Sequence, residues 1–97
     1  MIVERIVWAV KPGRGSDLVG LIQEVWGWLD SPVPHRILRP ISGQGSTIVQ
    51  EMEFEDFEER QKFRTDLYGR PEWPAARERW FELLEFGTSS EFFTLVK

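Results

Sequence analysis

The 97-residue sequence has no cysteine, no asparagine, a single histidine and no long apolar run. Without cysteine, disulfides and thiolate metal sites are excluded. No apolar stretch reaches the roughly 18 residues that suggest a membrane-spanning helix, so we expect no membrane segment. The first residues place no basic stretch ahead of an apolar run. We therefore expect no signal peptide and a cytoplasmic protein.

Basic residues are fewer than acidic ones: the chain has 12 Lys and Arg and 16 Asp and Glu, which gives a net charge of −4. Nonspecific nucleic-acid binding and anionic membrane surfaces both need an excess of positive charge, so neither is an expected partner. Gly13-Arg14-Gly15 lacks the third glycine of a dinucleotide fingerprint and the Lys-Ser/Thr of a phosphate loop. His35 and the scattered glutamates lack metal-ligand spacing, so we expect no metal and no cofactor.

Aromatic residues, in contrast, are abundant, with five Trp, seven Phe and one Tyr. A chain of this length forms one domain, residues 1–97, with a modest core. Each aromatic side chain buries roughly 150–250 Å². Some of these rings must therefore line a cleft or be covered by a second subunit.

Hydrophobic spacing predicts the element order β-α-β-β-α-α-β. Ser16 suits the N-cap of the first helix, and Asp56 with Glu59 forms a capping box for the second. Gly20 and Gly27 either allow close approach of a neighbouring backbone or are merely tolerated. The predicted strands span residues 2–10, 35–41, 47–55 and 91–96, and the helices span residues 17–29, 56–69 and from Pro71 or Pro74 to Gly87.

The stretch "LYGRPEWPA", residues 67–75, divides the second helical region into two helices. Gly69 suits the left-handed position that closes a helix. Pro71 cannot continue that helix and pushes Arg70 toward an extended conformation. Trp73 then packs where the two helices meet, either as core or against a ligand.

This order is that of the ferredoxin-like α+β fold, a four-stranded antiparallel sheet in the order 4-1-3-2 with helices on one face. The strand over residues 2–10 is apolar on both faces: Ile2, Ile6, Trp8 and Val10 on one, Val3, Val7 and Ala9 on the other. An apolar open face is unusual in a monomer. We therefore expect a homodimer through the open sheet face, a dimeric α+β barrel.

Two segments carry a family resemblance. The segment "ERIVWAVKPGRGSDLVGLIQEVW" resembles the strand, Pro-Gly turn and helix that open dimeric α+β barrel proteins. The segment "EMEFEDFEERQKFRTDLYGRPEWPAARERWFELLE" is similar to the second half of NIPSNAP-like members. The resemblance implies a homodimer with a cleft in each protomer and no settled activity. The wider superfamily includes cofactor-free monooxygenases, haem-degrading enzymes, isomerases and ligand binders, so the fold alone does not choose among them.

Seven residues are candidates for ligand binding. Trp8, Tyr68 and Trp73 either line an aromatic cleft or belong to the core. Arg5, Glu51 and Glu53 lie in the two central strands. Arg5 either pairs structurally with one of the two glutamates, or a glutamate serves as a tuned acid in the barrel.

His35 begins a strand, where it is either a surface group or a titratable one. Arg39 binds an anion or protects a sheet edge. Haem-degrading relatives use a helical His with Asn and Trp, and this chain has no Asn and no His on a predicted helix.

The sequence thus leaves two classes of function open. The first is a small homodimeric protein that binds a small, partly aromatic metabolite between sheet and helices, with a cofactor-free monooxygenase or isomerase as its catalytic version. The second is a non-catalytic structural or interaction module. A packed interior favours the module, and a cavity with convergent polar groups favours binding.

Overall fold

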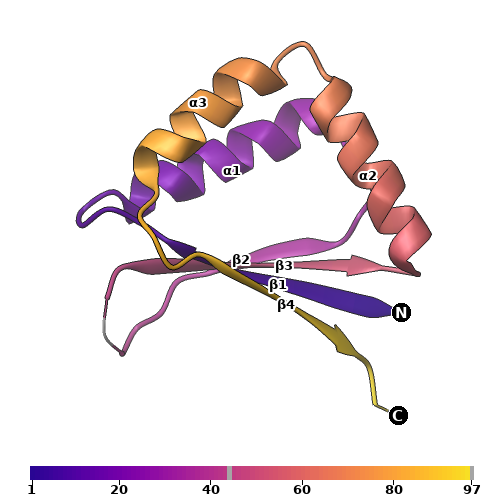
Figure 1. Ribbon diagram of the computed structural model, residues 1–97, viewed down its shortest axis with the longest axis horizontal. Helices are drawn as coiled ribbons and strands as arrows, with labels where there is room; N and C mark the ends of the chain where they lie inside the picture. Colours follow the sequence, from indigo (N-terminus) through magenta and orange to yellow (C-terminus); the bar gives the residue numbers. More distant parts are fainter. Residues whose placement is uncertain (44, 97) are drawn as a thin grey trace.

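Four antiparallel strands form one open sheet, and three helices cover one of its faces in the computed structural model (Figure 1). The structure describes residues 1–43 and 45–96. The strands lie in the order β2-β3-β1-β4, which confirms the predicted ferredoxin-like α+β fold. The elements are β1 (Ile2–Ala9), α1 (Gly15–Leu29), β2 (His35–Leu38), β3 (Thr47–Phe54), α2 (Phe57–Gly69), α3 (Trp73–Leu83) and β4 (Ser89–Thr94).

Alternation along the two central strands separates the faces of the sheet. Ile48 and Phe54 of β3 are buried beneath the helices. Val7 and Val49 are opposite each other in the β1–β3 register, on the face that no helix covers. The core between the sheet and the helices is built mainly from Leu18, Leu21, Ile22 and Val25 of α1, Ile48 of β3, and Ala76, Trp80 and Leu83 of α3.

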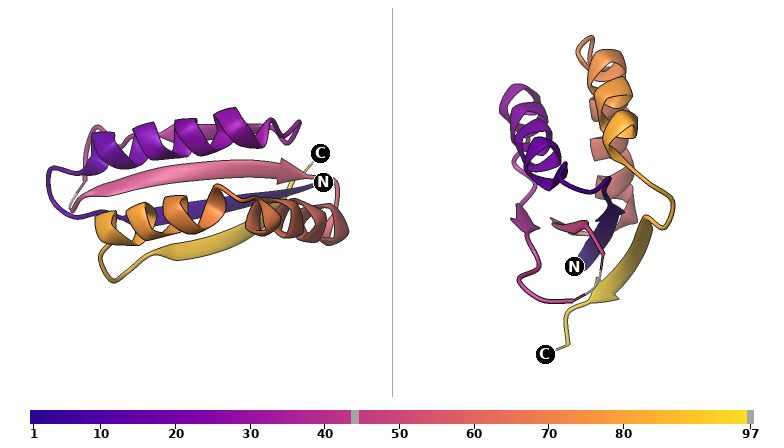
Figure 2. Two further views of the ribbon diagram at one scale, coloured as in Figure 1. Left: turned by 90° about the horizontal axis from the view of Figure 1, so that it is seen from above. Right: turned by 90° about the vertical axis from the view of Figure 1, so that its left-hand side faces the viewer.

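On the covered face, the helices form two rows that run along the two halves of the sheet. Figure 2 shows α1 above the β2–β3 side, while α2 and α3 follow one another above the β1–β4 side. α1 packs against α3 through the main core cluster, and Arg79 of α3 also forms an ion pair with Glu24 of α1 at 2.9 Å. Near α2, side chains from both rows of helices line the cavity that is described in the next subsection.

Element boundaries differ from the predictions at several places. α3 ends at Leu83, four residues short of the predicted Gly87, and β1 and β3 each end one residue early. β2 ends at Leu38, short of the predicted residue 41, because Pro40 cannot donate to a ladder. β4 spans residues 89–94 and not 91–96, since Ser89 and Ser90 already pair with β1. The first helix starts at Gly15 after Arg14, so the predicted N-cap Ser16 lies inside its first turn.

The capping box of α2 is confirmed, with the Glu59 amide donating to Asp56 Oδ1 at 2.8 Å. Of the two alternatives for Gly20 and Gly27, the structure favours the second, because a Cβ at either position would meet open space and neither residue allows a close backbone approach. The prediction for Gly69 is wrong. Gly69 is the last helical residue of α2 and does not adopt a left-handed conformation.

Arg70 explains how α2 ends without a left-handed residue. Its backbone is extended, as expected for a residue before Pro71. Its guanidinium reaches the end of α1, where Nη2 donates to the Leu29 carbonyl oxygen at 3.1 Å. The same nitrogen pairs with Asp66 of α2 at 3.1 Å, and that carboxylate raises the pKa of Arg70. The segment between α2 and α3 therefore links the end of α2 to the end of α1 through Arg70 and redirects the chain so that α3 can begin.

Among the described residues, no helix combines the length and apolar character that crossing a bilayer requires.

Candidate functional site

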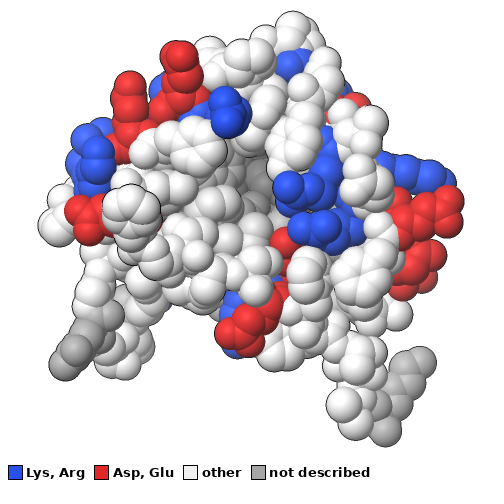
Figure 3. All heavy atoms as spheres, viewed as in Figure 1, with Lys and Arg blue, Asp and Glu red and all other residues white. Residues whose placement is uncertain are grey.

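A cavity of about 330 Å³ lies between the sheet and the helices, and it opens on the face seen in Figure 3. β1 and β3 form its floor, and all three helices supply its walls. Its lining residues are Glu4, Ile6, Trp8, Val25, Trp26, Leu29, Gln50, Met52, Phe63, Arg64, Leu67, Tyr68, Trp73, Arg77, Trp80 and Phe81. Most of this surface is apolar, with a few polar groups, as in small-molecule sites.

Three predicted site residues meet in this cavity. Tyr68 lies in the last turn of α2 and Trp73 begins α3, and their ring centroids lie 5.3 Å apart. Trp8 approaches from β1, and its ring lies 5.2 Å from that of Trp80. Because the chain turns between Tyr68 and Trp73, the helix break brings two aromatic side chains to one wall.

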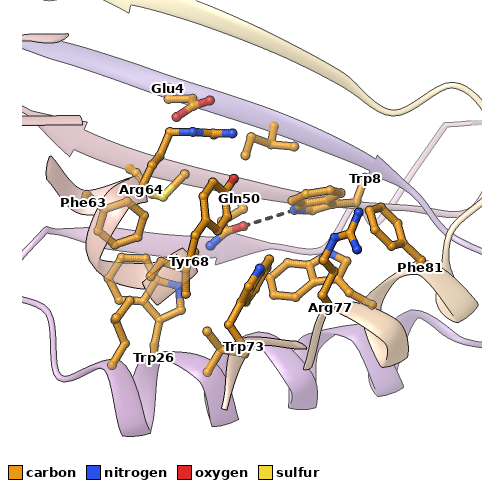
Figure 4. A pocket seen from close by; sticks show the side chains of 16 residues that line it. Glu4, Trp8, Trp26, Gln50, Phe63, Arg64, Tyr68, Trp73, Arg77 and Phe81 are labelled. Atoms are coloured by element: carbon orange, nitrogen blue, oxygen red, sulfur yellow. Dashed lines mark hydrogen bonds between the residues drawn. The ribbon is translucent and has the colours of Figure 1, made fainter. Parts of the chain in front are cut away.

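Gln50 places a polar group in the cavity floor. It is 3% exposed, and its Oε1 accepts a hydrogen bond from Trp8 Nε1 at 3.1 Å (Figure 4). An indole N–H can only donate, so the oxygen of the amide must face Trp8. The amide nitrogen is thereby left as a donor for a bound molecule.

Glu4 is the acidic group of the lining, and it is already occupied. Its carboxylate is 2% exposed and accepts bonds from Arg60 Nε at 2.9 Å and Arg60 Nη2 at 3.1 Å. Ser90 Oγ of β4 donates to it at 3.1 Å. The hydrogen bond to Glu4 raises the pKa of Arg60, and the opposite charges of the two side chains offset each other.

Neither Glu4 nor Gln50 was predicted as a site residue. The sequence contained a signal for both residues, because each interrupts a row of apolar side chains that face the helices. Glu4 shares its row with Ile6 and Trp8, and Gln50 stands between Ile48 and Met52. A polar residue in such a position is buried and needs a partner. The partner of Gln50 is 42 positions away and that of Glu4 is 56 positions away, which a local pattern does not show.

Two arginines stand at the cavity, and sequence reasoning missed both. Arg64 lies 5.1 Å from the centroid of the Tyr68 ring, and Arg77 lies 4.9 Å from that of Phe81. Figure 4 shows them on opposite sides of the cavity. Within residues 1–43 and 45–96, no acidic side chain lies at salt-bridge distance from either guanidinium.

Arg5 and Glu51 lie on the other face of the sheet and do not line the cavity. Of the two glutamates expected across from Arg5, Glu51 is its register partner, and Arg5 Nε donates to Glu51 Oε2 at 2.6 Å. Arg36 Nε donates to Oε1 at 2.6 Å. Burial of Glu51 would raise its pKa, but the hydrogen bonds and charges of Arg5 and Arg36 outweigh burial and hold the pKa below its ordinary value.

His35 and Arg39 also lie outside the cavity lining. The His35 ring stacks on Trp26, with centroids 3.8 Å apart and planes 8° from parallel. Trp26 lines the cavity, so His35 stands behind that wall. Burial lowers the pKa of His35. Arg39 Nη2 donates to Ser16 Oγ at 3.2 Å, beside a shallow hollow at the start of α1.

Metal-ligating side chains are scattered. Among the described residues, no group of three or more His, Cys, Asp or Glu is placed to hold an ion. Glu51, the most buried acid of the open face, is held between two guanidinium groups.

Solved structures resemble this chain over nearly its whole length. An uncharacterised NIPSNAP-domain protein from Burkholderia xenovorans superposes with a TM-score of 0.86 at 22% identity, covering 99% of this chain and 95% of that one. A NIPSNAP family protein from Agrobacterium tumefaciens gives 0.83 at 16% identity, covering 98% and 92%. This chain has the fold of NIPSNAP-domain proteins. At the level of fold, the resemblance to NIPSNAP-like proteins seen in the sequence is confirmed.

The NIPSNAP-like fold is shared with an oxygenase. A variant of SnoaB, a cofactor-independent oxygenase from Streptomyces nogalater, superposes with a TM-score of 0.72 at 13% identity, covering 99% of this chain and 93% of that one. No protein-family model and no curated protein matches the sequence. Function must therefore be argued from the cavity.

Proposed function

We propose that this NIPSNAP-like protein binds a small, partly aromatic metabolite in the cavity between its sheet and helices. The observation that carries the proposal is the cavity itself, about 330 Å³ of space walled by Trp8, Tyr68 and Trp73. Its volume lies within the range of about 300–1,000 Å³ for ligand sites. A purely structural module would be expected to pack these rings without such a space, because protein interiors are close-packed.

Titration with N-phenylnaphthylamine, a neutral aromatic probe that becomes fluorescent in apolar sites, tests this function. We expect saturable binding with one probe per chain. Leu67→Trp would fill the cavity from α2 and abolish the signal, because Leu67 lines it. Leu95→Trp is the matched control, since Leu95 is exposed beyond β4. No saturable binding to the unaltered protein, or equal binding by both variants, would refute the proposal.

We propose in addition that two copies pack through the open faces of their sheets. Figure 2 shows no helix on that face, and Val7 and Val49 lie opposite each other at its centre. Phe93 of β4 is 39% exposed beside Arg5, whose guanidinium carbon lies 5.1 Å from the ring centroid. A two-fold axis through this face would bury these apolar groups against their own copies.

Sedimentation velocity tests the homodimer. We expect the unaltered protein to sediment as a dimer at micromolar concentration. Val49→Glu would convert it to a monomer, because the substitution buries an unpaired charge in the interface. Phe86→Glu should stay dimeric, since Phe86 is fully exposed in the turn before β4. A monomeric unaltered protein would contradict this assembly.

A cofactor-free monooxygenase or isomerase is the alternative function. SnoaB, which shares the fold, is described as a cofactor-independent oxygenase. Proton transfer within this cavity would have to use Glu4 or Tyr68, and Glu4 is already engaged by Arg60 and Ser90. The binding function therefore predicts no oxygen uptake with phenolic aromatic compounds. Uptake that depends on the protein and is lost in Leu67→Trp would instead favour the enzyme.

A further inference from the structure

We infer that the ligand is an aromatic acid, a flat ring system with a negatively charged oxyanion group that is attracted to the cavity by Arg64 and Arg77, which flank it on opposite sides (Figure 4). This inference rests on the proposed function and names the chemical class that the cavity selects. It begins from a contrast in charge. The chain as a whole carries a net charge of −4. Of the charged lining residues, Glu4 is neutralised by Arg60, so Arg64 and Arg77 leave the cavity positive.

The position of Arg64 on α2 carries an electrostatic cost that no ion pair offsets among the described residues. Arg60 and Arg64 are four residues apart on α2, where like charges destabilise a helix. Arg60 is accounted for by its bidentate contact with Glu4. Arg64 has no such partner within residues 1–43 and 45–96, although Lys62 and Arg70 of the same helix region do find carboxylates.

The geometry of both arginines leaves their donors available. Each guanidinium packs on a lining ring, Arg64 on Tyr68 and Arg77 on Phe81. A cation–π contact is made with the face of the ring and does not require the five N–H groups of a guanidinium to form conventional hydrogen bonds. The rings therefore orient the two cations without consuming their hydrogen bonds. A planar carboxylate or similar oxyanion matches such donors.

The floor of the cavity complements the two arginines. Gln50 gives its oxygen to Trp8 and keeps its amide N–H groups for the cavity. The inner polar group is thus a donor, like the arginines. An aromatic acid with a carbonyl, ether or phenol oxygen at its inner end would accept a hydrogen bond from Gln50 there and place its acid group near the arginines.

Two probes that differ by one charged group test the inference. Anilinonaphthalene sulfonate has the ring skeleton of N-phenylnaphthylamine with a sulfonate added. We expect the sulfonate to bind the unaltered protein more tightly than the neutral probe. The double variant Arg64→Gln/Arg77→Gln should weaken the sulfonate at least about tenfold, the loss expected for charge-assisted hydrogen bonds, and change the neutral probe less than about twofold.

Controls separate the proposed contact from general attraction. Arg79→Gln removes an arginine of α3 that pairs with Glu24 and does not line the cavity, so it should leave both affinities unchanged. Arg64→Lys/Arg77→Lys keeps the charge and should retain most of the preference for the sulfonate, provided that the variant keeps its far-ultraviolet circular dichroism. About 0.5 M sodium chloride should weaken only the sulfonate.

The outcomes distinguish this inference from the function on which it rests. If the neutral probe binds but the sulfonate has no advantage, or if the glutamine double variant keeps that advantage, the acid specificity is wrong and the binding function stands. If neither probe binds the unaltered protein, the binding function and the inference fail together. A folded glutamine variant that loses the sulfonate selectively supports the inference.

Discussion

Glu51 of β3 lies directly across from Arg5 of β1, and their side chains meet at 2.6 Å on the face of the sheet opposite the cavity. Arg36 of β2 completes the contact, so one carboxylate ties three strands together. Glu51 is 3% exposed, whereas its partners remain in contact with water. The arrangement fixes the register of the sheet, and its energy can be measured.

Replacing Glu51 by Gln keeps the shape and removes the charge. We expect the free energy of unfolding to fall by about 1–3 kcal/mol, the range for hydrogen bonds to charged groups. Glu53→Gln is the matched control on the same strand, since Glu53 is exposed, and it should cost less than about 0.5 kcal/mol. Urea unfolding at one protein concentration measures both. Equal losses would show that the Glu51 contacts contribute nothing specific.

Acid should remove the advantage of Glu51. The folded-state pKa of Glu51 is depressed, so its contribution is fully present above the unfolded value of about 4.3 and is lost as pH falls through the folded value. The difference in unfolding free energy between the unaltered protein and Glu51→Gln should therefore shrink from about pH 6 to about pH 3. Urea titrations at both pH values measure it. A difference that stays constant with pH would contradict the depressed pKa.

The sequence predicted much of the sheet and one wall of the cavity. Strand alternation and topology placed Arg5 on one face with Glu51 and Glu53, and the register observed in the structure selects Glu51 as its partner. The helix break was sufficient to bring Tyr68 to Trp73, since they flank a turn of a few residues. In both cases a local pattern and a known topology determine the neighbours.

The rest of the site depends on which side of each helix faces the cavity, and the sequence did not show this for α2 and α3. α2 has no fully buried residue, so its apolar stripe does not define an inner side. Arg64 therefore looked like a surface residue, and so did Arg77 on the exposed part of α3. Gly69 failed as a left-handed cap for a related reason, because Pro71 constrains Arg70 and Arg70 finds its partners on α1.

His35 provides a pH dependence with a single titrating group. Burial lowers its folded-state pKa, so between that value and the ordinary value of about 6.5 the unfolded chain binds more protons than the folded one. Stability should therefore decrease as pH falls below about 6.5. His35→Phe keeps a ring for stacking on Trp26 and should remove this part of the pH dependence. Because the chain has one histidine, a proton NMR titration gives the pKa directly, and a value above 6.5 would reverse the argument.

The hydrogen bond between Trp8 and Gln50 predicts a coupling within the cavity floor. Gln50→Leu is close in volume but leaves the indole N–H of Trp8 without its acceptor, so we expect a loss of about 1–3 kcal/mol in unfolding free energy. In a Trp8→Phe background that donor is already gone, and the same substitution should cost about 1 kcal/mol less. Gln61→Leu on the exposed side of α2 is the control and should change stability by under about 0.5 kcal/mol in either background. Urea unfolding of the four proteins in the cycle measures the coupling. If Gln50→Leu costs the same with and without the indole, the bond does not hold the amide in place, and its nitrogen cannot be counted as a fixed donor to a ligand.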